Sequence, residues 1–249
     1  MKALILAAGY ATRLYPLTKD QPKALLPIGG KTIMDFLVEQ LNTIPELKEA
    51  HIITNHRFVS HFEAWAAKAA QESRYPNLRF IVWDDNTTCD DDKLGAVGDI
   101  QYVIEKAGLD DDLLIAASDN FFTFPLTDYY NDFMKHGCDT LLGGVIENVD
   151  DLRRFAVAKL DSDNRVELLV EKPADPPSNV AIYALYMYRR DTLPLFSQYL
   201  AEGNSPDAPG HFPEWLYTRK EVRVFIFDGE IIDIGTHDSY REVCERFGK

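Results

Sequence analysis

Strand-like apolar runs alternate with helix-like amphipathic segments along about the first 145 residues, and this alternation narrows the possible folds more than any other feature. Residues 2–7 form an apolar run before Gly9, as buried strands do. Residues 32–44 carry apolar side chains at 33, 34, 37, 38, 41 and 44, which is a helical period. We further expect strands at 50–54, 78–83, 113–117 and 140–146, and helices at 59–71, 95–107 and 127–136. Such alternation with short connections predicts a mainly parallel sheet with helices on both faces.

The pattern changes after about residue 146. Strands separated by turn sequences such as 161–164 and 175–178 are expected at 155–160, 165–170, 181–188 and 221–227, and helices at 191–199 and 239–246. We therefore predict one α/β domain over 1–249, with a Rossmann-like, mixed, mostly parallel sheet flanked by helices and a smaller antiparallel lobe. The lobes are expected at about 1–145 and 146–249. Ligands of open α/β sheets bind outside the carboxyl ends of the strands, which points to the segments after Ala7 and Ala117.

The charge balance excludes some partners. The net charge of −14 disfavours nucleic acid and anionic membranes, and no apolar run approaches the roughly 20 residues of a membrane span. Three cysteines, an odd number far apart in sequence, favour reduced thiols and a cytoplasmic location. Residues 1–31 nevertheless carry five Lys or Arg against one acid, Asp20. This segment is either a site for a small anion or a set of solvated surface cations.

A short loop of small residues follows the first expected strand. Ala7, Ala8 and Gly9 would let the backbone approach a ligand, and its N–H groups could donate to phosphate oxygens. The loop is neither the dinucleotide fingerprint, which needs three spaced glycines, nor a P-loop, which ends in Gly-Lys-Ser/Thr. Taken alone it fits an ordinary tight turn equally well.

A long ordered pattern extends from this loop. It runs Leu6-Ala7-Ala8-Gly9, Thr12-Arg13-Leu14, Pro16-Leu17-Thr18, Pro22-Lys23 and Leu25-Leu26-Pro27. This pattern resembles the signature of sugar-1-phosphate nucleotidylyltransferases, such as glucose-1-phosphate thymidylyltransferases. The resemblance implies a nucleotide-diphospho-sugar transferase-like fold in which Leu6, Ala7, Ala8, Gly9, Thr12, Arg13 and Lys23 bind the nucleotide. Arg13 and Lys23 would be catalytic, because two cations can neutralise the charge that grows on departing pyrophosphate.

Two aspartates are the expected ligands of Mg²⁺. Asp119 follows the apolar run 113–117, where the family has Gly-Asp-Asn and this chain has Ser118 in place of the glycine. Asp233 begins an Asp-Ile-Gly-Thr sequence that resembles the family's second metal-binding motif. Mg²⁺ is typically held by one or two carboxylates together with phosphate oxygens and water. Taken singly, Asp119 could instead form a turn and Asp233 could cap the following helix.

The resemblance also implies an acceptor site in the second half of the chain. Glu171-Lys172-Pro173 matches the family's Glu-Lys-Pro, where the carboxylate contacts sugar hydroxyls and the ammonium contacts the sugar phosphate. By the same resemblance we assign Ala156, Asn179 and Ala184 to acceptor binding. Ala156 and Ala184 stand where the family usually has glycine, and Tyr183 is a further departure, so a tighter pocket is expected. An ordinary surface charge pair is the alternative explanation of Glu171 and Lys172.

The segment 92–99 has two interpretations. It is either a base-facing loop around Gly95, in which backbone groups read a pyrimidine, or a simple helix start.

The expected activity is transfer of a nucleoside monophosphate from dTTP, UTP or CTP to a sugar 1-phosphate, with Mg²⁺ as cofactor. One alternative is a cytidylyltransferase acting on a phosphate such as phosphocholine, whose cation Tyr183 could face. Another is a non-catalytic relative on the same fold. The resemblance also implies a homo-oligomer, as relatives are often dimers or tetramers.

Overall fold

The computed structural model describes residues 1–122 and 124–248. Its contacts group the chain into two units that interleave along the sequence. Unit 1 contains Met1–Lys93, Ala116–Thr127 and Gly229–Lys249, and unit 2 contains Leu94–Ile115 and Asp128–Asp228. This grouping differs from the contiguous lobes expected at 1–145 and 146–249, because the last segment of the chain packs with the first.

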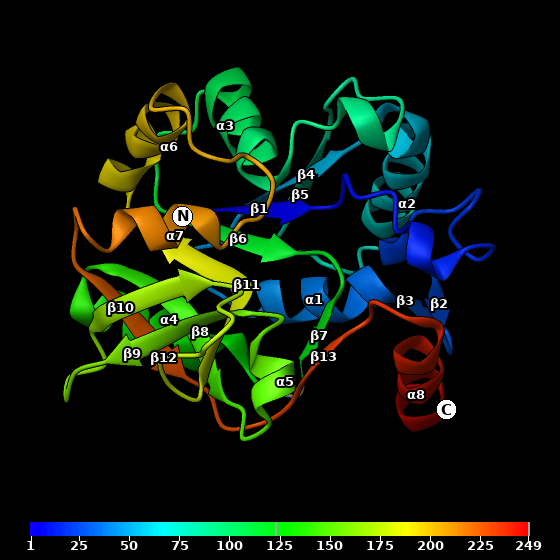
Figure 1. The fold of residues 1–249 in the computed structure, drawn as a ribbon. Coiled ribbons are helices and arrows are strands. Elements are labelled where there is room, and N and C mark those ends of the chain that lie inside the picture. Colours follow the sequence, from blue (N-terminus) through cyan, green and yellow to red (C-terminus); the bar gives the residue numbers. More distant parts are fainter. Residues whose placement is uncertain (123, 249) are drawn as a thin grey trace. The chain divides into compact units, whose positions relative to one another are not determined.

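Unit 1 is built on parallel strands (Figure 1). Strand β4 (Glu49–Thr54) lies between β1 (Lys2–Leu6) and β5 (Arg79–Asp84), and both pairings are parallel. Helices α1 (Ile33–Leu41) and α2 (Val59–Gln71) belong to this unit, and α2 packs against β5. The middle residues of β1 and nearly all of β4 are buried, as is usual for strands of a parallel sheet.

The buried carboxylate of Asp35 ties α1 to the segment after α2. Its Oδ2 accepts hydrogen bonds from the backbone N–H and hydroxyl of Thr32, at 2.7 and 2.8 Å, which forms the capping box of α1. Its Oδ1 accepts from Trp65 at 3.1 Å, Arg74 at 2.9 Å and Tyr75 at 2.7 Å. Asp35 is only 1% exposed, so these donors replace the water that the carboxylate loses on folding.

Two small antiparallel sheets complete unit 1. One pairs β2 (Pro27–Ile28) with β3 (Lys31–Thr32), and the other pairs β7 (Asn120–Phe122) with β13 (Ile231–Asp233), which lie side by side in Figure 1. Helix α8 (His237–Phe247) follows β13, and Tyr240 donates a hydrogen bond to the carbonyl of Pro27 at 2.6 Å. An apolar cluster joins these elements: Leu14, Leu26, Ile28, Ile33, Phe121, Ile232, Ile234 and Val243.

Unit 2 contains the antiparallel strands. Their order is β10 (Val166–Glu171), β9 (Ala156–Leu160), β11 (Val180–Tyr188), β8 (Asp139–Val145) and β12 (Val222–Ile226), and only the β8–β12 pair is parallel. The helices are α3 (Ala96–Ala107), α4 (Leu126–His136), the short α5 (Val149–Leu152), α6 (Leu193–Ala201) and α7 (His211–Leu216). Strand β6 (Leu113–Ala117) starts in unit 2 and ends in unit 1. The expected class, a mixed sheet flanked by helices with antiparallel additions, is confirmed.

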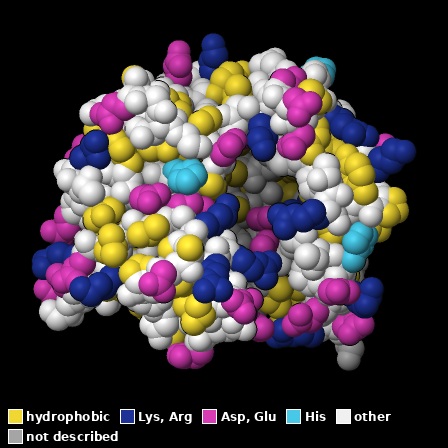
Figure 2. Space-filling model, in the orientation of Figure 1, with side chains coloured by type: hydrophobic (Ala, Val, Ile, Leu, Met, Phe, Trp, Pro, Cys, Tyr) yellow, Lys and Arg dark blue, Asp and Glu magenta, His cyan; other side chains and the backbone are white. Residues whose placement is uncertain are grey.

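Charged side chains of both signs lie on the surface in view, and the cysteines are free. Figure 2 shows Lys and Arg side chains interspersed with Asp and Glu on the face in view, so neither sign of charge covers that face. Cys89, Cys138 and Cys244 are free thiols. In the part of the chain that the structure describes, every helix is too short or too polar to cross a membrane.

A buried histidine lies within the parallel sheet of unit 1. Nε2 of His51 donates to Glu49 at 3.0 Å, and the indole N–H of Trp83 donates to Nδ1 of His51 at 2.8 Å, so the imidazole is neutral. Burial lowers the pKa of His51, although Glu49 opposes this effect and Lys2 adds to it. Burial alone would raise the pKa of Glu49, but hydrogen bonds from Arg79 and Lys2 lower it to about 2.

The depressed pKa of His51 predicts a loss of stability in mild acid. The unfolded chain takes up a proton near pH 6.5 while the folded chain does not, so the free energy of unfolding should fall as the pH drops below about 6.5. His51→Gln keeps a donor and an acceptor but does not titrate. Urea unfolding between pH 7.5 and 5.5 should therefore show a smaller loss for this variant. Equal losses in the two proteins would contradict the assignment.

Candidate functional site

The start of the loop that follows β1 is held by hydrogen bonds to residues at the end of β4. The N–H of Ala7 donates to the carbonyl of Ile53 at 2.9 Å, which extends the strand pairing by one residue. The hydroxyl of Thr54 donates to the carbonyl of Ala7 at 3.3 Å, and Nδ2 of Asn55 donates to the carbonyl of Ala8 at 2.9 Å. The end of β4 thus fixes the start of the loop.

The other end of the loop turns at Ala11, whose φ of 48° and ψ of 42° are left-handed. The hydroxyl of Thr18 donates to the carbonyl of Ala11 at 2.8 Å. Among the residues that the structure describes, the backbone N–H groups of 8–11 reach no acceptor. A Cβ added at Gly9 would meet no atom within 4 Å. The loop therefore presents free N–H donors beside open space, which suits phosphate oxygens.

The remaining residues of the N-terminal pattern continue from this loop. Leu6 ends β1, and Thr12 and Arg13 are exposed in the 3₁₀ turn Thr12–Leu14. Within the described residues, Arg13 makes no ion pair or hydrogen bond through its side chain, so its guanidinium is available to a ligand.

Lys23 and Asp119 are 96 residues apart in sequence and form an ion pair. Lys23 starts the 3₁₀ turn Lys23–Leu25, and Asp119 follows β6. Their side chains are 17% and 25% exposed, so the pair is largely withdrawn from water but still reachable. A cation is thereby fixed against the carboxylate that was predicted to bind metal.

Asp119 and Asp233 are brought together by the β7–β13 ladder. Asp233 lies opposite Asn120, and the N–H of Ile234 donates to the carbonyl of Asp119 at 3.3 Å. Thr236, three residues further on, is the N-cap of α8, so the alternative that Asp233 caps this helix is wrong. Among the described residues no three His, Cys, Asp or Glu side chains group as a metal site. Two carboxylates carried by adjacent segments would suit Mg²⁺, which takes its other ligands from phosphate and water.

The predicted acceptor residues lie in unit 2, and three of them are neighbours. Glu171 ends β10 and pairs with Ala156 of β9. The Glu171 side chain is 8% exposed and lies 3.4 Å from the ammonium of Lys172, which is 58% exposed and has a φ of 48°. Asn179 precedes β11, where its carbonyl accepts from Ile146, and Ala184 lies in the irregular part of β11.

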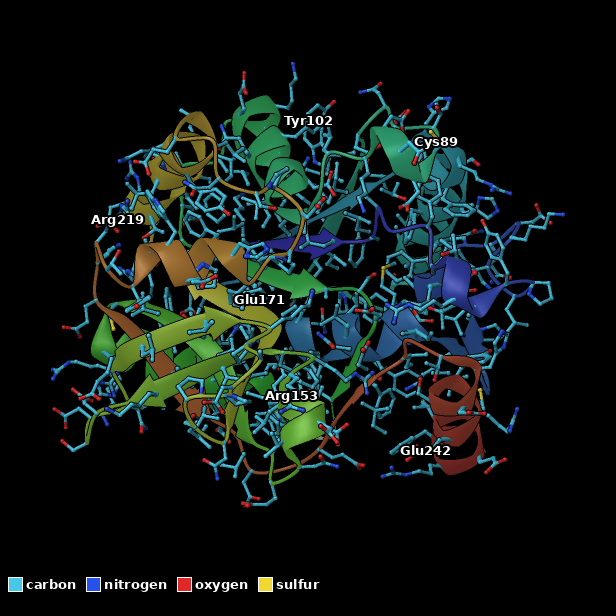
Figure 3. All side chains as sticks on the ribbon, in the orientation of Figure 1. Cys89, Tyr102, Arg153, Glu171, Arg219 and Glu242 are labelled. Atoms are coloured by element: carbon cyan, nitrogen blue, oxygen red, sulfur yellow. The ribbon has the colours of Figure 1, made fainter. Side chains whose placement is uncertain are left out.

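Gly210 was not foreseen from the sequence. A Cβ at this position would lie 2.0 Å from Oε2 of Glu171 and 3.3 Å from the Cβ of Ala156. Gly210 precedes α7, and Figure 3 shows Glu171 beside that helix. The missing side chain at 210 therefore leaves the space that the Glu171 carboxylate occupies. A Pro-Gly turn is too common a sequence to have indicated this role.

Gly210→Ala should weaken acceptor binding while leaving the fold intact. The new methyl group meets the flexible end of Glu171, which must turn away, so the cost falls on the position of the carboxylate. We expect a higher KM for the acceptor phosphate and little change in Tm or in the KM for the nucleotide. Gly30→Ala, whose Cβ would meet no atom within 4 Å, is the matched control. An unchanged acceptor KM would contradict this role.

Gly95 is fixed by contacts within unit 2. Its φ is 79°, and a Cβ there would lie 2.5 Å from the carbonyl oxygen of Pro206. The next two N–H groups, of Ala96 and Val97, donate to the carbonyls of Asp207 and Pro206 at 3.0 and 2.8 Å. These two donors of the α3 N-terminus are therefore already occupied, as in an ordinary capped helix start.

The comparisons with known proteins agree with this arrangement. A family model described as nucleotidyl transferase matches residues 2–248, nearly the whole chain. The chain belongs to the nucleotidyl transferase family. The expected resemblance is thereby confirmed at the level of the family.

Two curated relatives illustrate the breadth of the family. A protein of Sulfolobus acidocaldarius, provisionally assigned as a mannose-1-phosphate guanyltransferase, is 26% identical over 98% of this chain and 62% of its own length. A glucose-1-phosphate adenylyltransferase of Rhodopirellula baltica is 26% identical over 96% of this chain and 58% of its own length. The chain thus spans about three fifths of these curated relatives.

The solved structures share the fold. UDP-glucose pyrophosphorylase complexed with UDP-glucose superposes with a TM-score of 0.82 and 20% identity, and the match covers 99% of this chain and 97% of that chain. A glucose-1-phosphate thymidylyltransferase assigned in Bacillus anthracis gives a TM-score of 0.79 and 22% identity, covering 100% and 96%. At these identities the likeness confirms the fold alone.

Proposed function

We propose that the chain is a Mg²⁺-dependent nucleotidylyltransferase that transfers a nucleoside monophosphate from a nucleoside triphosphate to a sugar 1-phosphate. The observation that carries this proposal is the grouping of Lys23, Asp119 and Asp233 in unit 1. The same unit holds the loop whose N–H donors, and the Arg13 whose guanidinium, find no partner among the described residues. Anion donors and metal-ligating carboxylates are what transfer from a triphosphate requires. The names of the relatives above support the reaction class.

The proposed reaction is a direct displacement. An oxygen of the acceptor phosphate forms a bond to the α-phosphorus, and the bond from that phosphorus to the bridging oxygen breaks and releases pyrophosphate. No protein nucleophile is needed, because the attacking oxygen is already anionic. The chain's contribution is then to position both phosphates and to offset their charge.

Each residue has a distinct role in this scheme. The loop N–H groups and Arg13 hold the β- and γ-phosphates that leave, and Lys23 neutralises charge at the α-phosphate. Asp119 and Asp233 would hold Mg²⁺, which when bound withdraws charge from the phosphate oxygens. In unit 2, Lys172 takes the acceptor phosphate and Glu171 accepts hydrogen bonds from sugar hydroxyls.

The cytidylyltransferase alternative is not favoured by the structure. Tyr183 is 9% exposed and packs between Phe155 and Phe227, with ring centroids 5.1 and 5.5 Å away. Both neighbours cover its ring, so little of its face is left for a cationic acceptor. The non-catalytic alternative would lead one to expect missing phosphate or metal residues, and those residues are all present.

A matrix of nucleotides against acceptors tests the proposal. Each of ATP, GTP, CTP, UTP and dTTP is mixed with Mg²⁺ and one acceptor: glucose 1-phosphate, mannose 1-phosphate, N-acetylglucosamine 1-phosphate or phosphocholine. Pyrophosphate release is measured for every combination. We expect release with at least one sugar 1-phosphate and none without acceptor or Mg²⁺. The proposal would be refuted if pyrophosphate were released with phosphocholine but with none of the sugar 1-phosphates. It would also be refuted if pyrophosphate were released in the absence of any acceptor.

A further inference from the structure

The carboxyl ends of three neighbouring strands carry a row of polar groups in unit 1. Leu6 pairs with Ile53, and Thr54 pairs with Asp84, so Ala8, Asn55 and Asp85 follow the ends of β1, β4 and β5 in the same row. Asn55 donates to the carbonyl of Ala8, and the N–H of Asp85 donates to the carbonyl of Thr54 at 3.0 Å. Asp85 thus lies about two strand spacings, roughly 10 Å, from the end of β1.

The carboxylate of Asp85 is buried but only half satisfied. The residue is 5% exposed, and its Oδ1 accepts from both the N–H and the hydroxyl of Thr87 at 2.7 Å. Oδ2 is not among the fully buried atoms, and no donor in the described part of the chain reaches it. The hydroxyl of Tyr10 lies 3.5 Å from that of Thr87, which connects Asp85 to the phosphate-binding loop.

No described cation compensates this carboxylate. The neighbouring Asp84 is paired with His56 at 2.6 Å, and Asp92 accepts the N–H groups of Thr88 and Cys89. Cys89, labelled in Figure 3, marks this acidic segment after β5. Oδ2 of Asp85 keeps some access to solvent and has no described donor, so it has unused capacity to accept a hydrogen bond from a ligand.

Asn55 provides a second, independent observation. It is 0% exposed, and while its Nδ2 holds Ala8, its Oδ1 has no partner among the described residues. Two adjacent strand ends therefore both carry acceptors without donors. Ligands of open α/β sheets bind at this edge, and a ligand that fits here should present N–H groups.

We propose that Asp85 is a specificity-determining residue that selects a nucleotide with an amino-bearing base, guanine, adenine or cytosine, over uracil or thymine. The inference rests on the proposed function, because the phosphate loop at Ala8 places the nucleotide beside this row. The nucleoside extends from the loop past Asn55, and the base edge meets Oδ2 of Asp85.

The chemistry of the bases supports this choice. An exocyclic amine offers two hydrogens, and in guanine a ring N–H lies next to it. The imide N–H of uracil or thymine is flanked by two carbonyl oxygens, and these would face the carboxylate of Asp85. A carboxylate thus attracts the amino-bearing edge and repels the imide edge, which combines attraction and rejection in one residue.

Equilibrium binding of five Mg²⁺–nucleoside triphosphates to the intact protein tests this proposal. We expect at least one of GTP, ATP and CTP to bind about tenfold or more tightly than both UTP and dTTP. Asp85→Asn should reduce this ratio of affinities, amino-bearing nucleotide over UTP or dTTP, by about tenfold. Thr87→Val should reduce the ratio less, because the Thr87 N–H still holds Asp85. Asp84→Asn, a neighbouring carboxylate outside the row, should leave the ratio unchanged.

The outcomes separate this inference from the proposed function. Tight nucleotide binding and pyrophosphate release with UTP or dTTP as the best substrate would overturn the role of Asp85 alone. An unchanged ratio in a folded Asp85→Asn protein would do the same. If the wild-type protein neither binds any nucleotide nor releases pyrophosphate, the proposed function fails together with the inference. The wild-type ranking needs no variant, so misfolding of a variant cannot protect the proposal.

Discussion

Asp119→Asn is expected to lower pyrophosphate release by at least about 10²–10³-fold, the loss typical of removing one electrostatic contact to a reacting group. The amide keeps the shape of the carboxylate but loses the negative charge that pairs with Lys23 and that would hold Mg²⁺ beside Asp233. The ammonium of Lys23 would stay near the α-phosphate, but it would lose the carboxylate that fixes its position. We therefore expect kcat to fall much more than the affinity for the acceptor.

The measurement is initial-rate pyrophosphate release at saturating nucleotide, acceptor and Mg²⁺. Asp20→Asn is the matched control, because Asp20 lies in the same unit with its side chain 86% exposed. The control should retain normal turnover, and both variants should keep the wild-type Tm within about a degree or two. Turnover of Asp119→Asn near the wild-type level would refute the catalytic arrangement.

Asp35→Ala is expected to reduce the free energy of unfolding by about 3–5 kcal/mol, the usual cost of breaking a buried charged network. The substitution leaves the indole N–H of Trp65 and the hydroxyl of Tyr75 without their acceptor. These residues are only 7% and 6% exposed, so water cannot readily take the place of the carboxylate. It also removes the capping box of α1 and the partner of Arg74.

Urea unfolding followed by tryptophan fluorescence would measure this loss. Asp20→Ala should change the free energy of unfolding by no more than about 0.5 kcal/mol, as expected for an exposed side chain. A loss below about 1 kcal/mol for Asp35→Ala would mean that its donors find other acceptors or water, and that the network does not hold α1 in place.

Long, strongly patterned elements could be predicted from the sequence. The helix Val59–Gln71 begins and ends where the pattern places it, because hydrophobic periodicity over thirteen residues is hard to mistake. The strand Leu113–Ala117 is also placed correctly, by its short continuous apolar run. Most other boundaries differ by one or two residues. The helix expected at 32–44 differs more, since α1 starts at Ile33 and already ends at Leu41, three residues before the expected end.

Short elements were missed for a physical reason. Strands β7 and β13 have three residues each, too few to show a period of two, and they form because they pair with each other. Helix α7 has six residues and contains Pro213, which hides a helical pattern. Tertiary contacts decide such segments, and a single sequence does not record those contacts.

The same limit applies to the site. The ordered N-terminal pattern pointed to Arg13 and Lys23, and two further motifs pointed to Asp119 and Asp233, but the proximity of these residues depends on pairings between distant segments. The Lys23–Asp119 ion pair and the β7–β13 ladder became evident only in the structure. The space at Gly210 and the half-satisfied carboxylate of Asp85 likewise depend on what packs beside them.

The interleaved assembly of unit 1 sets the order in which a growing chain can mature. Strand β13 and helix α8 are made more than a hundred residues after β7, the strand with which β13 pairs. Until β13 and α8 emerge from the ribosome, Phe121 and its apolar neighbours remain uncovered. Nascent polypeptides with such exposed apolar surfaces attract chaperones. Asp119 and Asp233 therefore come to lie on adjacent segments only after the ribosome has passed β13.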